Sequence, residues 1–249
     1  QNAMLVNTTG HSNVAVGAVC MDANTTGQDN TAVGFNAMGS NTTASDNTAL
    51  GTSALGLNTT GNFNTAIGRL ALYTNTTGIR NTAVGAGAVD NNTSGQDNTG
   101  VGRNSLTANT TGSENTGLGI STGLNLTTGG QNTCVGSEAG HDLTTGSNNL
   151  LLGKSAGRSS SPSGTVNDES NIVCLGNDNI SSIFCADTSI SASDSRDKTD
   201  ISDFTKGLDW IKALRPVTYR WDRRTWYGTD AEPYGSPDGS KKKSKLHVG

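Results

Sequence analysis

Residues 58–74 read NTTGNFNTAIGRLALYT, and versions of this 17-residue unit follow one another without insertion along the chain. Because a fixed period of this length indicates stacked structural repeats, the repeat decides the fold before composition does. Nine units begin at Asn7, Asn24, Asn41, Asn58, Asn75, Asn92, Asn109, Leu126 and Leu143.

The positions of a unit form columns, numbered here from 1 at the opening Asn. The seventh column is Asn and the eleventh is Gly in all nine units. The tenth is always aliphatic, from Val16 to Leu152, and the fifteenth is apolar up to Leu106 and Gly from Gly123 onward. Two short apolar segments between Gly and Asn turns predict one coil of a parallel β-solenoid, each segment being a strand. A helical hairpin does not fit, since the unit is too short and poor in helix formers.

The stacking of coils predicts a structural role for each column. Identical residues in successive coils lie about 4.7–4.9 Å apart, so the Asn column is expected to form amide ladders and the tenth column a thin continuous core. Nine coils would span roughly 40–45 Å. So thin a core predicts an obligate oligomer, with close contact between chains through the Ala-rich ninth and fourteenth columns, such as Ala66 and Ala71.

Composition excludes several classes of protein. Only 32% of the 249 residues are hydrophobic and 4% aromatic, which rules out a conventional globular core of this size. Residues 1–190 carry five basic and twelve acidic side chains, so no nucleic acid is predicted as a partner. No apolar run approaches the roughly 20 residues of a membrane helix, so no membrane insertion is predicted. Cys20 and Cys134 replace Ala in the repeat and are predicted to be buried filler; no metal or cofactor is predicted from the Cys and His spacing.

The Asn-Thr-Ala-aliphatic-Gly segments at residues 30–34 and 64–68 resemble the repeats of trimeric autotransporter adhesin heads and of several phage tail fibres. The resemblance covers residues 1–159 and implies a trimeric β-roll shaft. Residues 160–192 are predicted to be a neck or cap, in which residues 171–176 form a degenerate coil.

The remaining residues have a different chemistry. Residues 191–249 hold twelve of the 17 Lys and Arg and seven of the eleven aromatic residues. Phe204, Leu208 and Ile211 share one face of a predicted helix, and residues 217–221 alternate like a strand. Residues 193–249 are therefore expected to form a small α+β segment after the all-β shaft.

Two motifs in this segment resemble the endosialidase-type intramolecular chaperone and auto-protease domain at the end of phage tail fibres and tailspikes. The first is SDSRDK at residues 193–198 and the second LRPVTY at residues 214–219. The family continues past a segment like HVG at residues 247–249 into a further helix, so a truncated domain is expected.

The resemblance implies that the domain guides trimer assembly and then cuts the chain between Ala192 and Ser193. Ser193 would be the nucleophile and Lys198 the general base, and Asp194 and Arg196 would complete the motif. A Ser hydroxyl needs such a base, and a Lys serves only if its pKa is lowered toward neutrality. The segment would be at most a single-turnover serine auto-protease.

The function expected from these resemblances is a homotrimeric tail fibre, extracellular on the virion, that attaches to a host cell-surface glycan or protein. A bacterial trimeric surface adhesin is the first alternative. A glycan depolymerase tailspike is the second, and it requires paired carboxylates in a groove. An ice-binding solenoid, suggested by the Thr-Thr columns, is the third.

Overall fold

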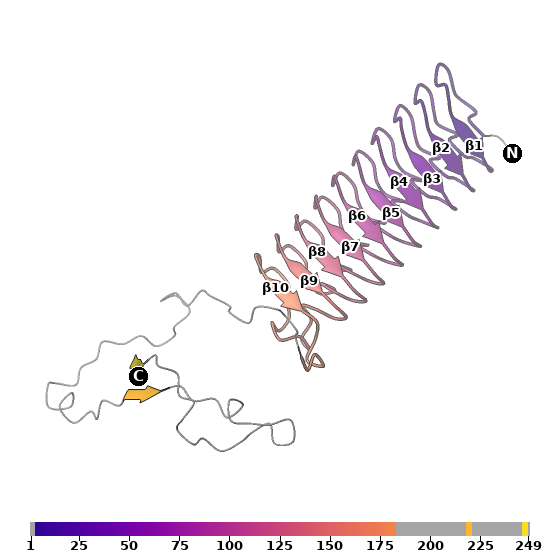
Figure 1. Cartoon of the computed structure of the whole chain (residues 1–249). Helices are drawn as coiled ribbons and strands as arrows, with labels where there is room; N and C mark the ends of the chain where they lie inside the picture. Colours follow the sequence, from indigo (N-terminus) through magenta and orange to yellow (C-terminus); the bar gives the residue numbers. More distant parts are fainter. Residues whose placement is uncertain (1–2, 183–217, 221–245, 249) are drawn as a thin grey trace, which may run out of the picture. The chain divides into compact units, whose positions relative to one another are not determined.

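The computed structural model describes residues 3–182, 218–220 and 246–248. Ten short strands stack side by side as one parallel sheet in strict chain order (Figure 1). The strands are β1 (Val14–Val16), β2 (Thr31–Val33), β3 (Thr48–Leu50), β4 (Thr65–Ile67), β5 (Thr82–Val84), β6 (Thr99–Val101), β7 (Thr116–Leu118), β8 (Thr133–Val135), β9 (Leu150–Leu152) and β10 (Val173–Leu175). The parallel β-solenoid predicted from the repeat is confirmed, and its coils are numbered below by their strands.

The register follows the repeat, because each residue pairs with the residue one unit further on, as Ala49 does with Ala66. Coil 10 departs from this spacing: Leu152 pairs with Leu175, so six extra residues lie within the connection. The degenerate coil predicted at residues 171–176 is thus a true tenth coil.

Each described coil holds one strand, and the prediction of two is wrong. The second apolar segment is a turn in which the thirteenth and fifteenth columns are left-handed, as at Asn36 (φ 54°) and Met38 (φ 51°). Its backbone still bonds from coil to coil, since Met38 N–H donates to Ala54 O at 3.0 Å. The turn columns are therefore as strictly stacked as the strands.

The interior holds small side chains from the ninth and fourteenth columns and larger ones from the fifteenth. Ala83, Ala88 and Val89 of coil 5 are all fully buried. The tenth column, predicted as the core, instead faces outward, where Leu50 is 48% and Leu118 50% exposed. The reason is strand alternation: in a three-residue strand only the middle residue points inward.

The side chains of the two Ala columns are buried within the coils of one chain. They are therefore not available for the contacts between chains that the sequence predicted. The two Cys residues predicted as buried filler are buried and free, and so is Cys174.

Two internal ladders of Asn side chains run along the solenoid, in the first and seventh columns. In the first, the Asn75 amide donates to Asn58 Oδ1 at 2.9 Å and to Gly78 O at 3.0 Å. In the seventh, Asn81 Oδ1 accepts from Asn98 N–H at 3.0 Å. The predicted amide ladder is confirmed, and it satisfies backbone groups that turns would otherwise bury unpaired.

The core changes its composition between coils 7 and 8. The fifteenth column loses its side chain at Gly123, and three residues later the first column changes from Asn to Leu126. A Cβ placed on Gly123 would lie 3.8 Å from Leu126 Cβ and 2.7 Å from Leu106 Cδ2. Leu106 of the preceding coil therefore reaches closest to the place of the missing side chain, and the backbone-proximal part of Leu126 borders it. Leu126 also ends the first Asn ladder, which leaves Asn109 Oδ1 buried without a partner.

Because Leu126 borders the place of the missing side chain, substitutions at Gly123 and Leu126 should be energetically coupled. Leu126→Asn alone should lower the free energy of unfolding by about 3 kcal/mol, because it opens a cavity. Gly123→Leu alone should overpack the core at a cost of about 1–3 kcal/mol. The double variant recreates the Leu106–Asn109 arrangement of the preceding coils, so its loss should fall short of the sum by at least about 1.5 kcal/mol. Thermal denaturation of the four proteins measures this coupling, and strictly additive losses would contradict it.

A second compact unit comprises residues 185–249. Within it, β11 (Thr218–Arg220) pairs antiparallel with β12 (Leu246–Val248), and Tyr219 lies opposite His247. The strand predicted at residues 217–221 is confirmed for its central three residues. The predicted helix that contains Phe204, Leu208 and Ile211 lies outside the described residues.

Candidate functional site

The residues predicted to cut the chain all lie outside the part that the structure describes. These residues are Ala192, Ser193, Asp194, Arg196 and Lys198, all within residues 183–217. The nucleophile and base roles remain predictions.

The structure does join two other pieces of the C-terminal motif. Tyr219, the last residue of the LRPVTY motif, lies in β11, and His247, the first residue of the HVG segment, lies in β12. The two strands exchange backbone hydrogen bonds as an antiparallel pair. Segments more than 20 residues apart in the sequence are thus neighbours in the fold, as expected of a small domain.

Residues 193–249 match the family described as "chaperone of endosialidase". We call this range the chaperone segment. The match starts at Ser193, after the last solenoid strand in the sequence, and together they fit a phage fibre with a C-terminal chaperone. The family is linked to phage tail proteins, which suggests a virion location. No curated protein and no solved structure matches the chain.

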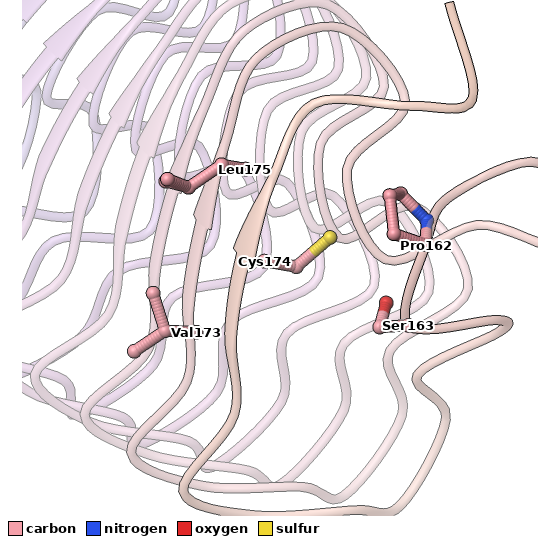
Figure 2. A pocket seen from close by; sticks show the side chains of 5 residues that line it. All are labelled: Pro162, Ser163, Val173, Cys174 and Leu175. Atoms are coloured by element: carbon pink, nitrogen blue, oxygen red, sulfur yellow. The ribbon is translucent and has the colours of Figure 1, made fainter. Parts of the chain in front are cut away.

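A cavity of about 370 Å³ lies at coil 10, beside the six-residue insertion. Figure 2 shows the five residues that line it, with the Cys174 sulfur pointing toward Pro162 and Ser163 of the insertion. Val173 and Leu175 flank Cys174 on β10. None of the five lining residues is acidic or basic, so the cavity does not offer the paired carboxylates of a glycan hydrolase.

The cysteines sit in two electrostatic environments. Burial raises the pKa of the Cys134 thiol to about 12, as expected for a thiol inside the coil. At Cys174 burial also acts to raise the pKa, but hydrogen bonds with the Ser163 and Ser161 side chains and with the backbone of Gly157 and Ser163 together outweigh it, so the pKa is lowered. Among the described residues, the groups that bond to this thiol are serine hydroxyls and backbone groups, which are not general bases, so we assign Cys174 a packing role at the end of the solenoid.

Charged side chains of the solenoid pair with one another between coils. Arg80 Nε donates to Asp97 Oδ1 at 2.6 Å, and this hydrogen bond holds the pKa of Asp97 below its usual value. Near coil 9, Arg158 Nη1 lies 2.6 Å from Glu138 Oε2 and its Nε lies 3.7 Å from Asp142 Oδ2. The carboxylates that bind one Arg in this way act as ion-pair partners. Because the pairs are partly exposed, each stabilises the fold only weakly.

Other site types have no support among the described residues. In that part of the chain, no helix is long and apolar enough to cross a membrane. Nor do three or more His, Cys, Asp or Glu residues gather there in a way that could hold a metal ion.

The feature that the sequence analysis missed is the outer face of the sheet. Besides the tenth column, the sixth, eighth and twelfth columns also place exposed apolar side chains on it, among them Phe63, Val14 and Phe35. The signal was present in the sequence, because this side of the repeat accepts residues from Ala to Phe, whereas a narrow interior position accepts only a small range of sizes.

Proposed function

We propose that the chain is the shaft of a homotrimeric phage tail fibre that attaches to a host-surface glycan or protein. The observation that carries this proposal is the order of the two parts: a ten-strand solenoid is followed along the chain by a match to the family described as chaperone of endosialidase. A solenoid with continuous hydrogen-bond and amide ladders is a rigid spacer, which suits a fibre. The chaperone segment then guides assembly of three copies.

We further propose that the chaperone segment releases itself. Lys198 takes the hydroxyl proton of Ser193, whose Oγ attacks the carbonyl carbon of Ala192. The Ala192–Ser193 peptide bond breaks as its nitrogen receives the proton, and water then hydrolyses the resulting ester. The products are a fibre ending at Ala192 and a fragment beginning at Ser193. The start of the family match at Ser193 supports this boundary.

Cleavage is tested in the full-length chain with Ser193→Ala and Lys198→Ala. Both variants should assemble but remain uncut, because folding guidance depends on the surface of the chaperone segment and cleavage on these two side chains. The control is Lys206→Ala, which changes another Lys of the same segment and should leave cutting intact. Denaturing electrophoresis with N-terminal sequencing decides the matter. A fragment that starts elsewhere, or normal cutting of Ser193→Ala, would refute the mechanism and leave the fibre proposal standing.

A further inference from the structure

Exposed apolar side chains gather on one face of the solenoid. Of the fourteen large apolar residues that are exposed in the described chain, ten lie on the outer side of the strands and the two turns that flank them. We call this the strand face. Its ten residues are Val14, Val16, Phe35, Leu50, Phe63, Ile67, Leu118, Ile120, Val173 and Leu175.

The strand face extends from coil 1 to coil 10 and is already ordered. Figure 1 shows the strands stacked in a single row, so the outward side chains form parallel ladders along the whole sheet. Backbone hydrogen bonds between coils, such as Thr65 N–H to Asn81 O at 2.9 Å, hold each strand in register with the next. The backbone of this face is thus already ordered before a partner binds, so binding costs little conformational entropy in the face.

The size of the face suits a stable protein interface. Ten strands at about 4.8 Å spacing and a width of six residues at about 3.3 Å each give roughly 43 Å by 20 Å. That is close to the roughly 800 Å² that each partner buries in a standard interface.

The two edges of the face carry opposite charges. The sixth column, along one edge, holds four acidic residues and one base, all exposed: Asp29, Asp46, Asp97, Glu114 and Arg80. The twelfth column, along the other edge, has basic residues and no acid: Arg69, Arg103 and Lys154, all exposed.

These charges distinguish between directions of association. When copies run parallel around an axis along the fibre, the acidic edge of one meets the basic edge of the next. An antiparallel pair facing across a perpendicular twofold axis would bring acidic edge to acidic edge, which is unfavourable.

We infer that the strand face binds a second copy of this chain, parallel and with equal coils at the same level. A partner with the same repeat matches ladders spaced by one coil over their full length, whereas an unrelated surface would not. In the homotrimer proposed above, on which this inference rests, the strand faces of all three copies turn toward the common axis. The contact is heterologous and closes as a ring.

The first test replaces Leu50 and Leu118, both about half exposed in the tenth column, by Lys in one chain. Because neither side chain enters the interior, the coils should still form, and native mass should fall from three chains to one with an unchanged circular dichroism spectrum. The matched control is Thr60→Lys with Thr111→Lys, at exposed positions of the third column. A Leu50→Lys/Leu118→Lys protein that stays trimeric would overturn the inference. A monomeric unmodified chain would instead overturn the proposed trimer.

The second test does not require a folded monomer. Single spin labels at Phe35→Cys, after β2, and Ala86→Cys, after β5, are placed in assembled protein whose four native cysteines are changed to Ala. Parallel copies in equal register should give the same label-to-label distance at both sites. In an antiparallel pair of ten coils, the site after β2 would face coil 9, and its distance would exceed the other by roughly 30 Å at 4.8 Å per coil. Unequal distances would overturn the parallel arrangement.

Discussion

Replacing Gly85 by Ala is expected to lower the free energy of unfolding by at least about 3 kcal/mol, because the site combines backbone strain with a backbone clash. Gly85 has a φ of +136°, a region that side-chain-bearing residues avoid. A Cβ there would lie 2.5 Å from Gly102 O and 2.6 Å from Gly102 C of the next coil. These atoms belong to the backbone ladder, so they cannot move aside without disturbing the coil.

The matched control is Gly164→Ala in the inserted loop of coil 10. Gly164 also has a positive φ, +69°, but no atom lies within 4 Å of an added Cβ. Only the left-handed strain remains, at about 1–2 kcal/mol. Thermal or denaturant unfolding compares the two variants. Equal losses would show that contact between coils is not what requires Gly in the eleventh column.

Asn81→Ala is expected to be the other severe substitution, at about 3–5 kcal/mol, because it leaves several buried polar groups unpaired. The Asn81 amide donates to Gly95 O at 2.8 Å, and its Oδ1 accepts from Asn98 N–H at 3.0 Å and from Asn98 Nδ2 at 3.1 Å. All of these groups lie inside the coil stack, where no other donor or acceptor replaces the lost amide.

The control for Asn81 is Asn91→Ala in the same coil. Asn91 is exposed, so water can replace whatever its side chain bonds to, and the loss should stay within about 0.5 kcal/mol. Denaturant unfolding followed by circular dichroism measures both. A small loss for Asn81→Ala would mean that the amide ladder contributes little and that the strands alone hold the coils together.

The repeat predicted the stacking direction, the register and the Asn ladder, because these depend only on which residues recur 17 positions apart. It did not predict which columns point inward. Val16 and Ala15 are both apolar, and only the alternation within a three-residue strand places Ala15 toward the interior and Val16 outside. Treating the larger residue as the core reversed the two faces.

The second apolar segment of the unit was wrongly predicted to be a strand, for a related reason. Its residues, such as Ala37 and Met38, are buried as a strand's would be, yet Met38 is left-handed and belongs to a turn. Apolar periodicity reports burial and not backbone conformation, so it could not distinguish a buried turn from a short strand. The Gly columns were correctly read as turns because they contain no side chain.

For the candidate site, the sequence predicted the motif and its residues but not their surroundings. The family match covers Ser193 and Lys198 and agrees with the resemblance, and the β11–β12 pair agrees with the predicted strand. The pKa of Lys198 depends on burial and neighbouring charge, which no sequence motif specifies.

If the proposed cleavage separates the fibre from the chaperone segment, the assembled shaft should be kinetically persistent, since the released chaperone segment cannot assist disassembly.

Native mass spectrometry of the protein assembled from the full-length chain tests the central claim most directly. It should find three fibre chains, each ending at Ala192, together with a free fragment that begins at Ser193. A single folded chain at micromolar concentration, stable without partners, would contradict the account.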